Sequence, residues 1–122
     1  MTITDLETTY QNGTTIVKSI IQVEGEIAGI AKLTVNADQC ILSELIVHQE
    51  HRGRGYSKEL QKHRENLIKN RFGMNEAYLF CNKNGTLRHQ YEKRGYQYYN
   101  DFDSSLDRFD GLEMIWMVKF LN

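Results

Sequence analysis

The chain has 122 residues, of which 40% are hydrophobic and 25% charged, and its formal net charge is −1. A chain of this length and composition buries a core without disulfides or metals, so disordered and fibrous classes are excluded and we expect one domain over residues 1–122. No apolar run approaches the roughly 18 residues of a membrane helix, and the first residues lack the basic and apolar regions of a signal peptide. We therefore expect a cytoplasmic protein without a membrane partner.

Residues 1–47 are expected to form strands joined by tight turns. Asn12-Gly13 lies between two strand-like runs and is a strong hairpin signal, and Glu24-Gly25 marks the next turn. The segment 36–39 is a third turn, and it leads into the apolar run "CILSELIV" over residues 40–47. The opening of the chain is therefore rich in strands and predicts no helix.

After these strands the pattern becomes helical. Tyr56, Leu60, His63 and Leu67 recur at spacings of four, three and four, which is the period of one helical face. The remaining segments are, in order, a strand over residues 76–81, a helix over residues 84–95 and two strands over residues 96–102 and 111–121. This order predicts an α/β domain (α+β layered) with two helices.

The charges are unevenly distributed along the chain. Residues 52–71 carry seven Lys or Arg against two Glu, a balance of +5, whereas residues 101–113 carry five Asp or Glu against one Arg, a balance of −4. This indicates a cationic site and a separate anionic site, and it argues against a nucleic-acid partner. The acidic segment is expected to attract a positively charged ligand, through residues Asp101, Asp103, Asp107 and Asp110.

The cysteines and histidines show no metal-ligand spacing. Cys40 and Cys81 lie in strand-like apolar segments and are expected to be buried thiols. The histidines are scattered as ordinary surface residues would be: His48, His51, His63 and His89. We therefore predict no metal.

The segment Arg-Gly-Arg-Gly-Tyr-Ser, residues 52–57, lies between the strand-like run and the helix. Glycine lets the backbone approach a phosphate closely, and the start of a helix adds partial positive charge and free N–H groups. The segment therefore predicts either a phosphate-binding loop or a tight turn with solvated arginines. The residues of the loop alone leave both readings open.

A second segment, "NKNGTLRHQYEKRGY" over residues 82–96, connects this loop to a known family. The loop resembles the acetyl-CoA signature Q/R-x-x-G-x-G/A of the GCN5-related N-acetyltransferases. The second segment resembles that family's signature N-x-x-A-x-x-x-Y-E-K-x-G-F, through Asn84, Leu87, Tyr91, Glu92, Lys93, Gly95 and Tyr96. The resemblance covers residues 40–122, and the two signatures occur in the family's order.

The resemblance implies a central mixed sheet flanked by the two helices and splayed between strands four and five, with acetyl-CoA as co-substrate in the gap. It implies that the end of the fourth strand pairs with pantetheine, through Leu45, Ile46 and Val47. It implies that the pyrophosphate lies in the loop formed by Arg52, Gly53, Arg54, Gly55, Tyr56, Ser57 and Lys58. Asn84 would contact the pantetheine arm from the opposite side, and Tyr91 would be the general acid near the sulfur.

The chain departs from the family pattern at several positions. Ser57 stands where Gly or Ala is usual, Tyr56 replaces a small aliphatic residue, and Leu87 replaces Ala. The two opening helices that cover the family's acceptor site have no counterpart before the third strand. We therefore expect a compact member with an open acceptor side, which a homodimer would complete.

Each proposed catalytic role has a structural alternative. Glu44 is the candidate base, since a carboxylate among aliphatic side chains has a raised pKa; on an alternating strand it shares a face with Leu42 and Ile46. Its alternative is an exposed residue paired with a basic neighbour. Tyr91 is alternatively a core aromatic side chain of its helix, and Lys58 a residue of a solvated helical face.

The resemblance thus implies transfer of an acetyl group from acetyl-CoA to an amine, in a small molecule or a protein, by direct attack through a tetrahedral intermediate. A backbone N–H of the fourth strand would stabilise the oxyanion. The alternative is an acyl-CoA-binding module without significant turnover.

Overall fold

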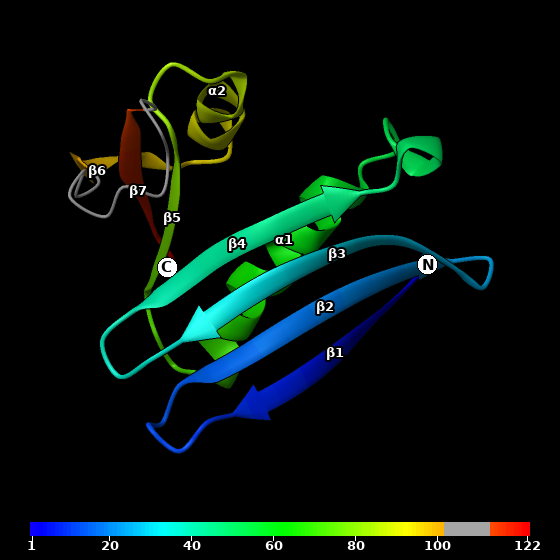
Figure 1. Cartoon of the computed structure of the whole chain (residues 1–122), viewed down its shortest axis with the longest axis horizontal. Helices are drawn as coiled ribbons and strands as arrows, with labels where there is room; N and C mark the ends of the chain where they lie inside the picture. Colours follow the sequence, from blue (N-terminus) through cyan, green and yellow to red (C-terminus); the bar gives the residue numbers. More distant parts are fainter. Residues whose placement is uncertain (102–112) are drawn as a thin grey trace.

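A computed structural model describes residues 1–101 and 113–122 of the chain. Three of the four aspartates in the expected acidic site, Asp103, Asp107 and Asp110, lie outside the described residues. The described strands form one sheet with the order β1-β2-β3-β4-β5-β7-β6 (Figure 1). Their bounds are Thr2–Thr9 (β1), Thr15–Val23 (β2), Glu26–Val35 (β3), Cys40–Val47 (β4), Glu76–Asn82 (β5), Gln97–Asp101 (β6) and Met114–Phe120 (β7).

The first four strands form an antiparallel meander, as the turn signals predict. The β1–β2 turn contains Asn12-Gly13, where the Asn12 side chain accepts a hydrogen bond from the Thr14 N–H at 3.0 Å. The β2–β3 turn contains Glu24-Gly25, and β4 pairs antiparallel with β3. No helix lies between β1 and β2, so the expectation of a strand-only opening is confirmed.

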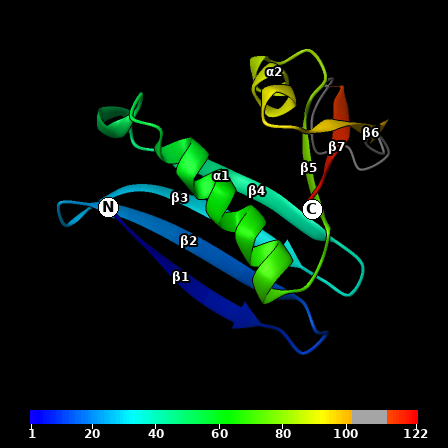
Figure 2. The same ribbon diagram turned by 180° about the vertical axis from the view of Figure 1, so that it is seen from behind.

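One face of this meander is covered by α1 (Tyr56–Asn66), which continues as a turn of π-helix over Leu67–Arg71. Figure 2 shows α1 lying along β2, β3 and β4, whereas Figure 1 views the uncovered face. The buried side chains recur at a helical period, at Leu60, Arg64 and Ile68. The helix predicted from the sequence is therefore confirmed, with the unexpected feature that one of its inward residues is an arginine.

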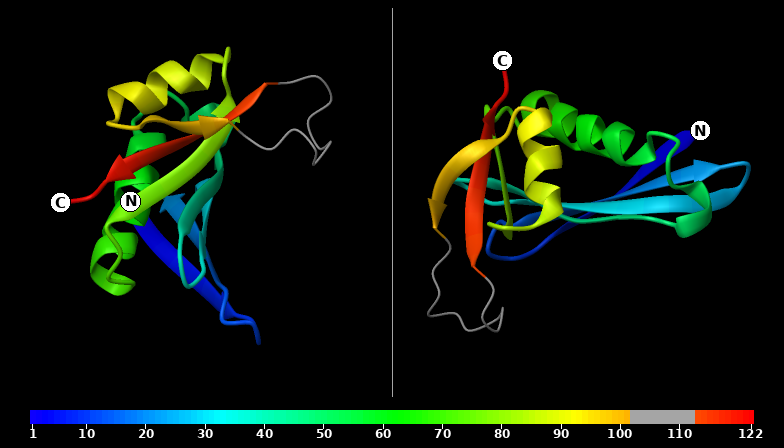
Figure 3. Two further views of the ribbon diagram at one scale, coloured as in Figure 1. Left: turned by 90° about the vertical axis from the view of Figure 1, so that its left-hand side faces the viewer. Right: turned by 90° about the horizontal axis from the view of Figure 1, so that it is seen from above.

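The second half of the sheet carries α2 (Thr86–Lys93), which lies beside β5 (Figure 3). This helix ends before Gly95, as the sequence predicts, and Tyr96 begins the return to β6 with 2% of its surface exposed. Among the described residues, neither helix has the length and apolar character needed to cross a membrane.

The two halves of the sheet meet at a single residue pair. β4 and β5 run parallel and pair only at Ile41↔Tyr78, and β5 then diverges from β4 (Figure 1). The predicted splay between the fourth and fifth strands is confirmed. Beyond Ile41, the edge of β4 that faces β5 has no strand partner among the described residues.

A β-bulge interrupts β4 at Glu44 and Leu45. The register shifts from Lys32↔Ser43 to Ile30↔Ile46, and Glu44 has a positive φ of 49°. Because one extra residue inverts the alternation of a strand, the expectation that Leu42, Glu44 and Ile46 share a face is wrong. Leu42 is buried, whereas Ile46 is 62% exposed.

Candidate active site

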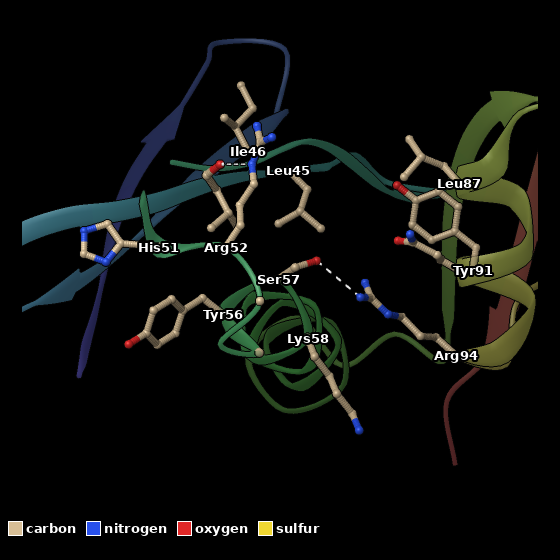
Figure 4. Close-up of a pocket in the computed structure, with 14 residues that line it drawn as sticks. Leu45, Ile46, His51, Arg52, Tyr56, Ser57, Lys58, Leu87, Tyr91 and Arg94 are labelled. Atoms are coloured by element: carbon tan, nitrogen blue, oxygen red, sulfur yellow. Dashed lines mark hydrogen bonds between the residues drawn. The ribbon is translucent and has the colours of Figure 1, made fainter. Parts of the chain in front are cut away.

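A cleft of about 730 Å³ opens where the end of β4, the start of α1 and the inner face of α2 meet (Figure 4). Its volume lies within the range of ligand pockets. Most of the predicted residues line it: Leu45, Ile46, Val47, Arg52, Gly53, Gly55, Tyr56, Ser57, Lys58 and Tyr91. Arg54 and Asn84 are exposed and are not among the lining residues.

The glycine loop forms the entrance of the cleft. Gly53 and Gly55 have φ angles of 78° and 83°, and Gly55 is the N-cap of α1. A Cβ at either position would meet no other atom within 4 Å, so the loop leaves open space above its backbone. The N–H groups at the start of a helix attract anions, and this geometry fits a phosphate.

Two arginine contacts hold the loop between β4 and α2. Nε of Arg52 donates to the carbonyl oxygen of Val47 at 3.0 Å, and Nη2 of Arg94 donates to Oγ of Ser57 at 3.3 Å (Figure 4). Both guanidinium groups place positive charge beside the loop. Lys58, in the first turn of α1, extends away from β4 (Figure 4).

Tyr91 extends from α2 toward β4 and lines both this cleft and a smaller cavity (Figure 4). Its ring lies 6.1 Å from that of Tyr96 and packs against the hydrophobic core. Burial raises the pKa of the Tyr91 hydroxyl, and the nearby positive charge of Arg64 opposes that shift. The side chain therefore combines the packing of a core aromatic residue with access to the cleft.

The smaller cavity, of about 110 Å³, lies in the splay between β4 and β5. Glu44 lines it together with Tyr91, Leu45 and Phe80, so the two candidate catalytic residues share one cavity. The side chain of Glu44 is 61% exposed, with a carboxylate oxygen 4.0 Å from Nζ of Lys32. The expectation that aliphatic side chains surround this carboxylate is wrong, because the bulge turns Glu44 toward solvent.

Asn84 occupies the turn between β5 and α2. Its backbone N–H donates to the side chain of Asn82 at 3.0 Å, which shapes the turn before the first residue of the helix. The observed contact is therefore one that orders the turn.

Sequence reasoning missed His51, Gln90 and Arg94, which also line the cleft. Arg94 could have been found, because Leu87 and Tyr91 lie on one face of α2 and Arg94, the C-cap residue, continues their helical spacing. His51 is 7% exposed, and its Nε2 lies 3.4 Å from the carboxylate of Glu26, the first residue of β3. Because this contact joins residues that are far apart along the chain, no local sequence pattern indicates it.

A second cavity of about 370 Å³ continues the cleft between α1 and α2. It shares lining residues with the cleft and is rich in cations: Lys58, Lys62, Lys93, Arg94 and Lys119, with Gln61, Gln90 and Glu65. Glu65 forms an ion pair with Lys119, in which Nζ of Lys119 lies 2.9 Å from Oε1 of Glu65. The other cations face a cavity that suits an anionic group.

The sequence model of the Acetyltransferase (GNAT) family matches residues 3–96. The chain therefore belongs to this family, whose members are generally acyl-CoA-dependent N-acetyltransferases. No curated protein matches the chain closely enough to count as a relative by sequence.

Solved structures of acetyltransferases share the fold. An IAA acetyltransferase from Bacillus cereus has a TM-score of 0.73 and 18% identity, over 87% of this chain and 78% of the other. A GNAT family acetyltransferase from Elizabethkingia anophelis with acetyl-CoA bound has a TM-score of 0.73 and 16% identity, over 98% of both chains. The PaiA N-acetyltransferase from Thermoplasma acidophilum, in complex with coenzyme A, has a TM-score of 0.69 and 20% identity, over 86% of this chain and 60% of the other.

Proposed function

We propose that the protein transfers an acetyl group from acetyl-CoA to a primary amine. The observation that carries this proposal is that one cleft joins an unpaired strand edge, a glycine loop at a helix N-terminus and the hydroxyl of Tyr91. An unpaired edge binds an amide-containing chain as a strand would, and the loop binds phosphate. Acetyl-CoA contains both groups, which supports its choice as the co-substrate.

In this proposal, the pantetheine arm lies along residues 45–47 and the pyrophosphate lies over residues 52–58. The nucleotide end then points toward the second cavity, where Lys58 and Arg94 connect the two spaces. Asn84, which the family resemblance assigns to the arm, lies on the turn before α2 and is not among the residues that line the cleft. The acetyl group would lie beside Tyr91, at the entrance of the small cavity.

The reaction is a direct attack. The amine nitrogen bonds to the thioester carbon, and a backbone N–H of β4 stabilises the oxyanion of the tetrahedral intermediate. The C–S bond then breaks, Tyr91 donates its proton to the thiolate, and the proton released by the amine passes to Glu44, directly or through water. Exposure of Glu44 lets this proton continue to solvent, and Tyr91 regains a proton from the water of the open cleft after CoA leaves.

The test of the cofactor site is acetyl-CoA binding with the loop altered. Acetyl-CoA at about 100 times its dissociation constant stabilises the wild type by about 2.7 kcal/mol, and this is read as a rise in melting temperature. Gly55→Glu places a side chain and a negative charge in the open space of the loop, at a φ that disfavours it, so we expect that rise to be lost. Wild-type stabilisation of Gly55→Glu would show that the loop assignment is wrong.

An acyl-CoA-binding module remains the second candidate, because the proposed base is exposed and faces Lys32. An assay of thiol release from acetyl-CoA with a panel of amines distinguishes the two. Binding without release above the blank, across small amines and peptide lysines, supports the module and contradicts the transferase.

A further inference from the structure

Arg64 has the largest fully buried side chain among the described residues. No step of the proposed reaction uses its guanidinium group. It lies on the inner face of α1, with 2% of its surface exposed, and contacts β3 and β4. Burial of an unpaired charge is costly, so its contacts indicate what the position requires. Burial lowers the pKa of Arg64 to about 10, which leaves the group charged at neutral pH.

The contacts of Arg64 converge on the bulge of β4. Nη1 donates to the carbonyl oxygens of Lys32 at 2.8 Å and Ser43 at 2.9 Å, and Nη2 donates to Oε1 of Gln61 at 2.7 Å. Lys32 and Ser43 are the last pair of the β3–β4 ladder before the register shifts. One nitrogen thus binds both strands at the point where the ladder is interrupted.

The other side of the bulge is held by close backbone packing. A Cβ at Gly29 would lie 2.8 Å from the carbonyl oxygen of Ile46, so β3 and β4 approach there as only glycine allows. Beyond this point the ladder resumes, and the N–H of His48 donates to the carbonyl oxygen of Ala28 at 2.8 Å. The bulge is therefore fixed from both ends.

We infer that Arg64 is a positioning residue that fixes the β4 bulge and thereby sets the strand edge of residues 45–47 against the acyl-CoA arm. The inference rests on the proposed function, because it assigns that edge to the arm. Arg64 lines the small cavity with Leu45 and Tyr91. It acts on the ligand indirectly, through the position of the β4 backbone to which it is hydrogen-bonded. Its loss is expected to affect the arm and the reacting carbonyl, and to spare the nucleotide.

The experiment compares two ligands by calorimetry: acetyl-CoA, and 3′-phosphoadenosine 5′-diphosphate, which contains the nucleotide and pyrophosphate without the arm. Arg64→Met should bind acetyl-CoA about tenfold more weakly, the equivalent of one lost hydrogen bond, and bind the nucleotide as the wild type does. We expect kcat to fall by about 10²-fold, as a displaced reacting group predicts. Arg64→Lys keeps the charge but lacks the planar guanidinium. Its affinity for acetyl-CoA and its kcat should lie between those of the wild type and of Arg64→Met.

The matched control is His63→Ala on the same helix. His63 is tied to Asp5 of β1, with Nε2 2.9 Å from Oδ1, and its loss should lower the melting temperature while leaving both affinities and kcat unchanged. A general loss of helix stability is thereby separated from an effect on the bulge. If His63→Ala loses acetyl-CoA affinity as Arg64→Met does, the inference is overturned.

Gly29→Ala disturbs the same bulge from β3 and decides the question if Arg64→Met does not fold. It should reproduce the selective loss of acetyl-CoA affinity, as should Arg64→Lys to a smaller extent. Wild-type affinity for acetyl-CoA in the folded variants would overturn the role of Arg64. Failure of the wild type to bind either ligand would instead contradict the proposed function.

Discussion

Tyr91 is half-buried against the core and also lines the cleft, so a single hydroxyl distinguishes its two roles. Tyr91→Phe keeps the ring and its packing and removes only the proton donor. If the hydroxyl protonates the leaving thiolate, we expect transfer to slow by about 10²–10⁴-fold, measured as thiol release at saturating acetyl-CoA. Because burial raises the pKa of Tyr91, ionisation of the hydroxyl should cause no loss of rate between pH 7 and 9.

The affinity for acetyl-CoA and the melting temperature are the controls for this variant. Both should stay near the wild-type values, since a single lost hydrogen bond costs about 1 kcal/mol at most sites. Normal binding together with a wild-type rate would leave Tyr91 as a core residue only.

Glu44 projects from a bulge, and its carboxylate is accessible to solvent. If it accepts the proton of the amine, Glu44→Gln should lower the rate by about 10²–10⁴-fold at neutral pH without changing the affinity for acetyl-CoA. The matched variant Lys32→Met removes the neighbouring cation and should leave most of the activity. A wild-type rate for Glu44→Gln would assign the proton to ordered water.

At the scale of helices and strands, the sequence predicts the features that depend on residues close together along the chain. The strand order of the meander, the start of α1 after Gly55 and the end of α2 before Gly95 all follow from local turn and cap signals. The glycine loop and Tyr91 could be assigned because their spacing resembles the family's two signatures. Their meeting in one cleft follows from the fold that those signatures imply.

The bulge and its clamp could not be predicted in this way. The run 40–47 reads as a regular strand, and only the observed register shows that Glu44 and Leu45 together oppose one residue of β3. Arg64 occupies an inward position of an amphipathic helix, where its charge suggests solvent exposure. Its two backbone partners are carbonyl oxygens 32 and 21 residues away, and such contacts have no sequence pattern.

The cavity between α1 and α2 predicts a preference for ligands with a 3′-phosphate. Lys62 and Lys93 line it from the two helices, and neither has an ion pair among the described residues. Replacing both with Met should weaken binding of CoA by about 1–2 kcal/mol at low salt and leave dephospho-CoA unaffected.

Lys18→Met is the control for this pair, since Lys18 is an exposed cation of β2 outside the cavity. It should change neither affinity. Equal losses for CoA and dephospho-CoA in the double variant would place the 3′-phosphate elsewhere.

For the whole molecule, the ionisable groups of the core predict a loss of stability at high pH. Burial raises the pKa of Cys40 from 9.0 to about 11, and burial and Glu65 raise the pKa of Tyr96. A group whose pKa is higher in the folded state favours folding below its unfolded pKa, and that contribution is lost as the pH rises through the folded value. The free energy of unfolding should therefore fall between about pH 9 and pH 11.

Urea unfolding at pH 8, 9, 10 and 11, with a reductant present, measures this loss. Cys40→Ala removes one of the titrating groups, so its stability should fall less steeply over the same interval. Val17→Ala makes a cavity in the same core without a titrating group and should run parallel to the wild type. Parallel curves for all three proteins would contradict the role of Cys40.

The single β4–β5 pair has a consequence for solubility. An unpaired strand edge inside an empty cleft is still an edge, and a strand from another molecule can pair with it as readily as a ligand can. The apolar residues at that edge, with Ile46 62% exposed, add to the tendency. We expect the ligand-free protein to aggregate when it is concentrated, which light scattering measures. Either acetyl-CoA or the substitution Ile46→Lys should slow this aggregation. Equal scattering from the ligand-free protein, the protein with acetyl-CoA and the Ile46→Lys variant would contradict this expectation. The co-substrate would then also act as the missing strand that keeps neighbouring molecules apart.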